Sequence, residues 1–153
     1  MSRPETARFT LDPKLEADTI EVARWPLCRV LLMNDRTYPW LILVPQRADI
    51  IEMHHLEPED RTRLIHEIAL AARLLENATK AHKINIGALG NVVSQLHVHV
   101  IARFKEDPAW PKPVWGHQPP EPYDSASLAH TMRMLRESMT PPRPDKPGKP
   151  RSV

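Results

Sequence analysis

The chain has 153 residues but little glycine, a single cysteine and no long apolar run. No stretch approaches the roughly 18 consecutive apolar residues that a membrane-spanning helix requires, so we expect no membrane span. Cys28 has no second cysteine to pair with inside the chain, which favours a reducing, cytoplasmic setting. The first ten residues lack the apolar core of a secretory signal, and we therefore expect none.

A strong excess of charge is also missing, since the formal net charge is only +2. Residues 140–153 contain four basic side chains and one acidic side chain and so carry +3, which leaves −1 on the rest of the chain. The basic excess therefore belongs to one end and not to a binding face, which argues against a nucleic-acid partner.

Proline is abundant, with 17 residues, and eleven of them follow residue 107. The prolines after Thr140 stand among basic residues, which predicts a disordered tail at 140–153. Residues 1–10 are expected to form a loose N-terminus, and a single domain is expected at 11–139.

Apolar periodicity predicts an α+β domain with strands in antiparallel style. Pro13 suits the first position of a short helix that ends near Asp18, and Pro58 that of a long helix that ends near Ala81. A further helix is expected at 125–138, where Leu and Met recur every three or four residues. The strands predicted before the long helix lie at 19–23, 28–33 and 40–44.

The most informative strand is expected at 92–103, where polar and apolar residues alternate. A period of two places Gln95, His97 and His99 on one face of that strand. Near neutral pH, one imidazole can attack an electrophile while its neighbour holds or protonates an oxygen. Two alternatives stay open: two polar residues on a solvated strand face, or a metal site on His97 and His99.

A metal site would need a third ligand, and no histidine stands at a diagnostic spacing from the pair. The candidates for that third position are His54, His55, His82 and His117, or a carboxylate. We therefore predict no metal and no other cofactor.

Residues 95–101 (QLHVHVI) resemble the motif of the histidine triad (HIT) superfamily, in which histidines alternate with apolar residues after a glycine-containing turn. The resemblance covers about residues 20–105 and is closest to compact bacterial HIT-domain proteins with a Q-x-H-x-H variant and a W-P-x-P-V-W-G segment, here 110–116. It implies a five-stranded antiparallel sheet with two main helices, and a homodimer.

The resemblance also implies a function, because HIT proteins are nucleotide hydrolases or nucleotidyl transferases. By that likeness His97 is the nucleophile that attacks an α-phosphate and is transiently nucleotidylated. His99 contacts the phosphate or the bridging oxygen. Asn34 and Asp35 fall where the family binds the ribose hydroxyls. The loop that holds the phosphate oxygens corresponds to Asn85, Gly90 and Asn91.

The chain departs from the family pattern at supporting positions. Gln95 replaces the first histidine of the motif, and Val92 stands where a serine or threonine is preferred. The pair Pro39-Trp40 stands where many relatives have Gly-His. These losses suit a weakened or redirected enzyme, and they equally suit a nucleotide-binding module without turnover.

The segment 104–123 combines six prolines with half of the aromatic residues of the chain. Trp110 and Trp115 offer rings that stack on a nucleobase or cover the site. The alternative is that both rings pack on the core of their own segment. Because this segment directly follows the histidine strand, we expect it to be a stiff cover over the site.

Overall fold

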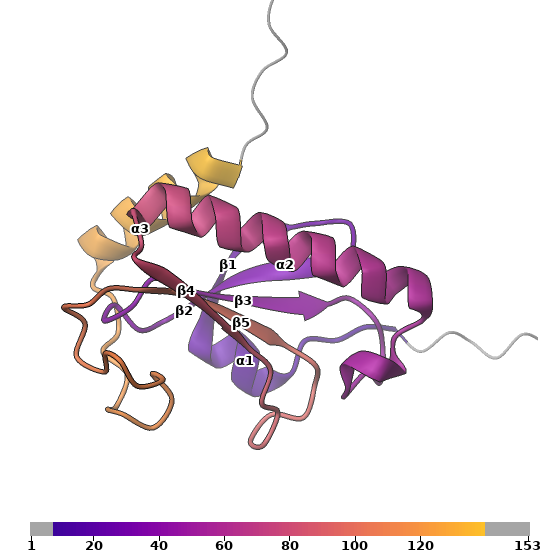
Figure 1. The fold of residues 1–153 in the computed structure, drawn as a ribbon. Coiled ribbons are helices and arrows are strands. Elements are labelled where there is room, and N and C mark those ends of the chain that lie inside the picture. The colour runs from indigo at the N-terminus through magenta and orange to yellow at the C-terminus, as the bar shows by residue number, and fades with distance from the viewer. Residues whose placement is uncertain (1–7, 140–153) are drawn as a thin grey trace, which may run out of the picture.

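Five antiparallel strands form one sheet in the order β1-β2-β3-β5-β4 in the computed structural model, which describes residues 8–139 (Figure 1). The expectations for residues 1–7 and for the tail at 140–153 lie outside the described residues. The strands are β1 (Thr19–Arg24), β2 (Cys28–Met33), β3 (Trp40–Pro45), β4 (Lys83–Gly87) and β5 (Val98–Arg103).

The helices are α1 (Pro13–Asp18), α2 (Pro58–Thr79) and α3 (Ser125–Met139), with a 3₁₀ turn, η1, at Met53–His55. Proline opens α1 and α2 as predicted, and the Asp12 side chain caps α1 by accepting from the Lys14 amide. Helix α2 ends at Thr79, slightly before the predicted Ala81, because Lys80 adopts the left-handed conformation with φ of 57°. No helix among residues 8–139 is long and apolar enough to cross a membrane.

The α+β fold is confirmed, but the strand predicted at 92–103 begins only at Val98. Its ladder ends there: β4 pairs no further than Gly87 opposite His99, and β3 pairs with β5 no further than Leu43 opposite Val98, although β3 itself runs to Pro45. The Leu96 amide donates instead to the Ile50 backbone oxygen at 2.9 Å, outside the ladder. The sequence did not predict β4, because residues 85–91 contain two glycines and indicate a loop.

The two faces of the sheet carry separate hydrophobic clusters. Helices α2 and α3 cover one face and α1 lies against the other (Figure 1). Within β5, Val98, Val100 and Ala102 pack in the cluster under α2 and α3. Ile101 joins the cluster on the α1 side, and alternation places His99 on that same side. Strand β5 therefore presents its polar residues opposite the long helix.

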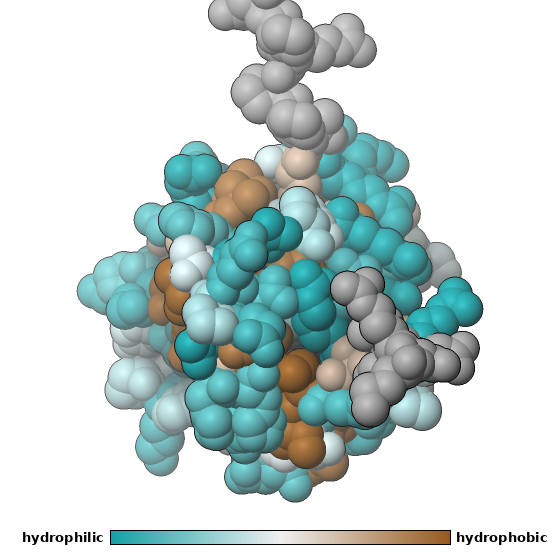
Figure 2. Space-filling view, turned by 90° about the vertical axis from the view of Figure 1, so that its right-hand side faces the viewer, coloured by the Kyte–Doolittle hydropathy of each residue, from teal (hydrophilic) through white to brown (hydrophobic). Residues whose placement is uncertain are grey.

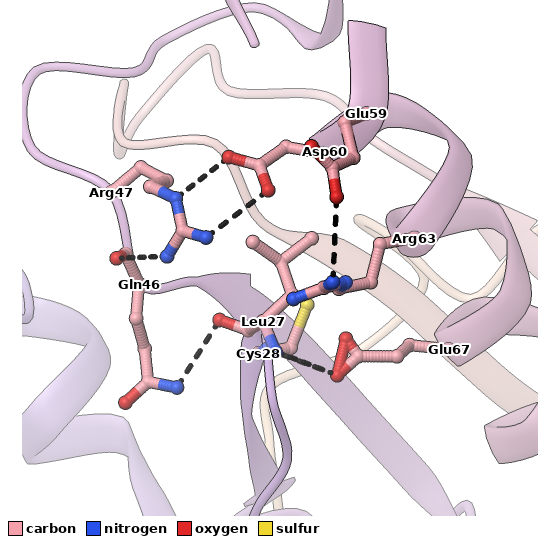
Figure 3. Close-up of polar contacts among 8 residues, drawn as sticks. All are labelled: Leu27, Cys28, Gln46, Arg47, Glu59, Asp60, Arg63 and Glu67. Atoms are coloured by element: carbon pink, nitrogen blue, oxygen red, sulfur yellow. Dashed lines mark hydrogen bonds and ion pairs between the residues drawn. The ribbon is translucent and has the colours of Figure 1, made fainter. Parts of the chain in front are cut away.

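Helix α2 is tied to the start of β2 by the buried carboxylate of Glu67 (Figure 3). Its Oε1 accepts the backbone N–H groups of Leu27 at 3.0 Å and Cys28 at 3.2 Å. Burial first, and the negative charge of Glu67 second, raise the pKa of the Cys28 thiol far above its usual range. Cys28 is therefore a protonated, unreactive core residue.

A second tie joins the chain after β3 to the first turn of α2. The guanidinium of Arg47 donates to both carboxylate oxygens of Asp60, at 2.7 and 3.1 Å (Figure 3). This bidentate pair and the Glu67 contacts hold the helix at both β2 and β3. The sheet face under α2 is thus fixed, which leaves the opposite face to form the site.

We predict that Glu67→Ala lowers the free energy of unfolding by about 2 kcal/mol, because two buried amide groups lose their acceptor. Urea denaturation measures this difference. Glu67→Gln, which retains an acceptor oxygen, is expected to recover most of the loss. Glu76→Ala, at an exposed position of the same helix, is the control and is expected to change little. Equal losses for Glu67→Ala and Glu76→Ala would contradict the assignment.

Candidate functional site

A pocket of about 490 Å³ opens on the α1 side of the sheet. Helix α1 forms one wall, and β3, β5 and the loop 89–93 form the others. The residues predicted from the sequence that line it are Asn34, Gly90, Asn91, His97, His99 and Trp115. The structure thus gathers both histidines of the motif with part of the predicted substrate-binding set.

His97 lies just before β5 and is almost fully buried. Its Nδ1 stands 2.6 Å from the backbone oxygen of Gln95. A carbonyl oxygen can only accept a hydrogen bond, so Nδ1 must carry the proton. Nε2 of neutral His97 therefore holds a lone pair, as a nucleophile requires.

His99 has the opposite arrangement. The indole Nε1 of Trp40 donates to His99 Nδ1 at 2.9 Å, so that Nδ1 is an acceptor and Nε2 carries the proton. Burial, followed by the proximity of His97, lowers the pKa of His99 to about 4. The two rings lie 5.0 Å apart between centroids. With His97 neutral, the pocket therefore holds one imidazole with a lone pair beside another with an N–H donor.

Trp115 lies over these rings, with its centroid 5.3 Å from that of His99 and 6.3 Å from that of Trp40. Gly87 at the end of β4 faces His99 across the sheet and leaves room for the indole. A Cβ at Gly87 would lie 3.0 Å from the Trp115 ring, so a side chain there would displace it. The glycine is thus needed for close approach of the indole.

Asn34 and Asp35 separate, although they are adjacent in sequence. Asn34 lines the pocket, and its Oδ1 accepts the backbone N–H of Tyr123 at 3.0 Å. Asp35 is buried outside the pocket lining, where its Oδ1 accepts the amide groups of Thr37 at 3.0 Å and Glu121 at 3.2 Å. Asp35 therefore joins the turn after β2 to the chain before α3.

Asn85 and Trp110 stand away from the pocket, around the buried guanidinium of Arg103. Arg103 donates to Asn85 Oδ1 at 2.7 Å, forms a bidentate pair with Asp107, and lies over the Trp110 ring at 5.6 Å. It also donates to the backbone oxygen of Lys112 at 2.8 Å. Asn85 lies in β4, not in a loop, and these two predicted substrate-binding residues instead hold the segment 104–115 in place.

The Gln95 side chain does not line the pocket with the two histidines, although a period of two predicts one shared face for all three. Its Nε2 donates to the Thr10 backbone oxygen at 2.8 Å, and its Oε1 accepts the Asp12 amide at 2.9 Å. The expectation assumed a strand over 92–103, but Gln95 precedes β5, and its side chain bonds to the segment before α1 instead. Its backbone oxygen contacts the site directly, through His97.

Sequence reasoning missed two contributors to the pocket. The sequence marks Trp40 only as a departure from the family pattern, and nothing in it connects Trp40 with His99, 59 residues away. The second is the α1 wall, which includes Lys14 and Asp18 and for which the sequence predicts only a short helix. The apolar residues of α1 gave no indication of the face against which the helix packs.

A metal site on His97 and His99 would have no third ligand among the described residues. Among residues 8–139, no group of three or more His, Cys, Asp or Glu side chains is arranged to hold a metal ion. The histidines considered for that position do not line the pocket; they are His54, His55, His82 and His117. The pocket also contains the carboxylate of Asp18, but this group is paired with Lys14 at 2.7 Å and does not form a metal-binding group with the two imidazoles.

Known structures match this chain over most of its length. A histidine triad protein from Sinorhizobium meliloti is 53% identical, covers 86% of this chain and 97% of its own, and superposes with a TM-score of 0.83. One from Bradyrhizobium japonicum is 42% identical, covers 88% of this chain and 100% of its own, with a TM-score of 0.85. One from Marinobacter aquaeolei is 43% identical, covers 86% and 96%, with a TM-score of 0.84.

No curated protein matches the chain. The model of the HIT domain matches residues 14–106, which span the pocket from α1 to the end of β5. The fold of this family supports a nucleotide-binding or nucleotide-hydrolase type of function in general. From the family model and the related structures together, this chain belongs to the HIT family.

Proposed function

We propose that this protein is a cytoplasmic nucleotide hydrolase or nucleotidyl transferase that acts at the α-phosphate of a nucleoside phosphate derivative through His97. The observation that carries the proposal is the opposed hydrogen bonding of the two imidazoles. His97 presents a lone pair at Nε2, and His99 presents an N–H at Nε2, in one pocket. A nucleophile beside a donor for a phosphate oxygen suits displacement at phosphorus.

In the first step, His97 Nε2 attacks phosphorus and the bond to the leaving group breaks. The ring then carries a positive charge, and its Nδ1–H still donates to the Gln95 oxygen, so this hydrogen bond strengthens as charge develops. The Nε2–H of His99 stabilises a phosphate oxygen. Water or another acceptor then attacks phosphorus and releases His97.

The remaining pocket walls suit the nucleoside part of the substrate. Asn34 is an amide at the rim for ribose hydroxyls, and Gly90 and Asn91 border the histidines for phosphate oxygens. Trp115 and Ile42 add apolar surface for a base. Asp35, Asn85 and Trp110 keep these walls in place and do not contact the substrate in this proposal.

Gln95 acts as a clamp for the α1 wall in this proposal. Its side chain holds the backbone at Thr10 and Asp12, the segment that leads directly into α1. Lys14, Leu15 and Asp18 of that helix line the pocket. The clamp therefore supports substrate binding, while the backbone oxygen of the same residue orients the nucleophile.

We also propose that two copies associate along β4. This strand is at the edge of the sheet and pairs only with β5 among the described residues. Ile86 on β4 is 53% exposed, and Leu89 and Val92 follow it at 47% and 83%. Apolar patches also reach the surface among hydrophilic side chains in Figure 2. A second edge would satisfy the free backbone groups and cover these side chains.

His97→Ala is expected to lower kcat by at least about 10³-fold, because the nucleophile is removed. The substrates to be tested are dinucleoside polyphosphates and nucleoside phosphoramidates. With the wild type, mass spectrometry should find the nucleotide bound covalently to His97. His117→Ala, an exposed residue outside the pocket, is the control and keeps activity. Purine monophosphates that raise the Tm without any turnover or adduct would instead support the nucleotide-binding module.

Gln95→Ala is expected to raise KM several-fold with a smaller change in kcat, because the α1 wall loosens while the backbone oxygen at His97 remains. Gln46→Ala is a matched control, because the Gln46 side chain also makes two hydrogen bonds to the backbone: its Nε2 donates to the oxygens of Trp25 and Leu27, away from the pocket. Both variants should lose about 1 kcal/mol of stability. Steady-state kinetics measure KM for both variants. Equal KM values for Gln95→Ala and Gln46→Ala would show that Gln95 does not support the pocket.

Ile86→Lys is expected to convert a dimer into a monomer, because a charge on β4 opposes edge-to-edge pairing. Light scattering after size exclusion measures the mass in solution. Ala129→Lys, at an exposed position of α3, is the control and should remain dimeric. A monomeric wild type, or a dimeric Ile86→Lys variant, would overturn the β4 pairing.

A further inference from the structure

The hydrogen bond between Trp40 and His99 restricts the chemistry of the pocket. An indole N–H can only donate, so its partner nitrogen must offer a lone pair for as long as the 2.9 Å contact persists. Protonation of His99 at Nδ1 would set two N–H groups against each other. Both side chains are buried, at 6% and 8% exposure, so water cannot easily replace the lost partner.

The surroundings of His99 also oppose its protonation. The centroid of the Trp40 ring lies 5.6 Å from that of His99 and the centroid of Trp115 lies 5.3 Å from it, so that two indoles exclude water from the imidazole. His97 is the titratable group beside His99, and its positive charge during the reaction further opposes a proton on His99. The pKa of His99 is accordingly lowered to about 4.

The other titratable groups that line the pocket do not supply an acid. Lys14 and Asp18 of α1 are paired at 2.7 Å, and the hydrogen bond to Asp18 raises the pKa of Lys14, which therefore keeps its proton. The one N–H of neutral His97 points to the Gln95 oxygen. Lys14 is thus paired with Asp18, and His97 with the Gln95 oxygen, so that neither is arranged to protonate a leaving group.

We propose that Trp40 is a positioning residue that holds His99 as a neutral Nε2–H donor, and that the pocket therefore releases leaving groups that depart as stable anions. The inference rests on the proposed function of His97. His99 then stabilises charge on oxygen but does not transfer a proton. Substrates with phosphate-like or acidic phenol leaving groups are favoured over those that release an alkoxide or an amine.

The bonds and protons balance without a general acid. The His97 Nε2 lone pair forms the N–P bond, the P–O bond breaks, and its electron pair remains on the leaving oxygen. A neutral His99 that gave up its Nε2 proton would become an imidazolate, which is far too basic to form here. In the second step water adds to phosphorus, the N–P bond breaks, its electron pair returns to Nε2, and the proton of the water passes to solvent.

The first test measures how kcat/KM depends on leaving-group acidity, with nucleoside 5′-aryl phosphates that carry phenols of graded pKa. Without an acid, we expect kcat/KM to fall by about 10²-fold or more from the most to the least acidic phenol. Trp40→Phe removes the N–H that opposes protonation of His99 and keeps an aromatic ring. In this variant the decrease of kcat/KM with phenol pKa should therefore become shallower as the pH is lowered toward 6. Trp115→Phe is the matched control, since that indole packs on His99 without a hydrogen bond to it.

The second test is spectroscopic and needs no substrate. In ¹⁵N–¹H spectra of the wild type, His99 should show the Nε2–H tautomer and remain neutral down to about pH 5, given its lowered pKa. Trp40→Phe should raise the apparent pKa of His99, and Trp115→Phe should leave the tautomer unchanged. If Trp40→Phe fails to fold, the wild-type spectrum still decides the assignment.

The outcomes separate this inference from the proposed function. An Nδ1–H tautomer, an imidazolium near pH 6 in the wild type, or rates independent of leaving-group acidity would overturn the role of Trp40. Absence of both turnover and a His97 adduct would instead contradict the proposed function, while the spectra would still determine the state of His99.

Discussion

The position of β5 between β3 and β4 is the constraint on which the rest of the structure depends. Because side chains of a central strand alternate between two covered faces, every second residue of β5 must be apolar for the helices above. The remaining positions must be satisfied by partners on the α1 side. His99 and Arg103 occupy two of them, and each has found specific partners in the described chain.

These partners divide the sheet face into a reactive part and a structural part. At one end Trp40 and the Gln95 oxygen determine which nitrogen of each imidazole carries a proton. At the other end Arg103 holds Asp107 and Asn85, and so directs the segment 104–115 back over the sheet. That return brings Trp115 onto His99, where Gly87 leaves the space for it. The proline-rich segment thus completes a pocket that begins at the histidines.

The sequence was sufficient for the elements that are stabilised locally. Strand β2 was predicted at its observed bounds, and Pro13 and Pro58 marked the starts of their helices because proline suits the first turn. The predicted start of β5 was wrong, because the extent of a strand depends on long-range pairing: β5 pairs with β3 only from Val98 and with β4 only from His99. For the same reason β4 was overlooked: its five residues have no strong alternation and depend on pairing with β5.

By itself the sequence determined the α+β class, the long amphipathic helix, and the pairing of His97 with His99, since residues two apart near a strand stay close in any fold. The tertiary structure alone decided the partners of those histidines, because the bonds of His99 and Gln95 span 59 and more than 80 residues. The tertiary structure also decided that Asn34 and Asp35 have different partners, although they are adjacent in sequence. It decided as well that Asn85 and Trp110 contact Arg103 and do not line the pocket. Alternation specifies which residues face one another across a sheet only when the register is known, and the register follows from contacts along the whole chain.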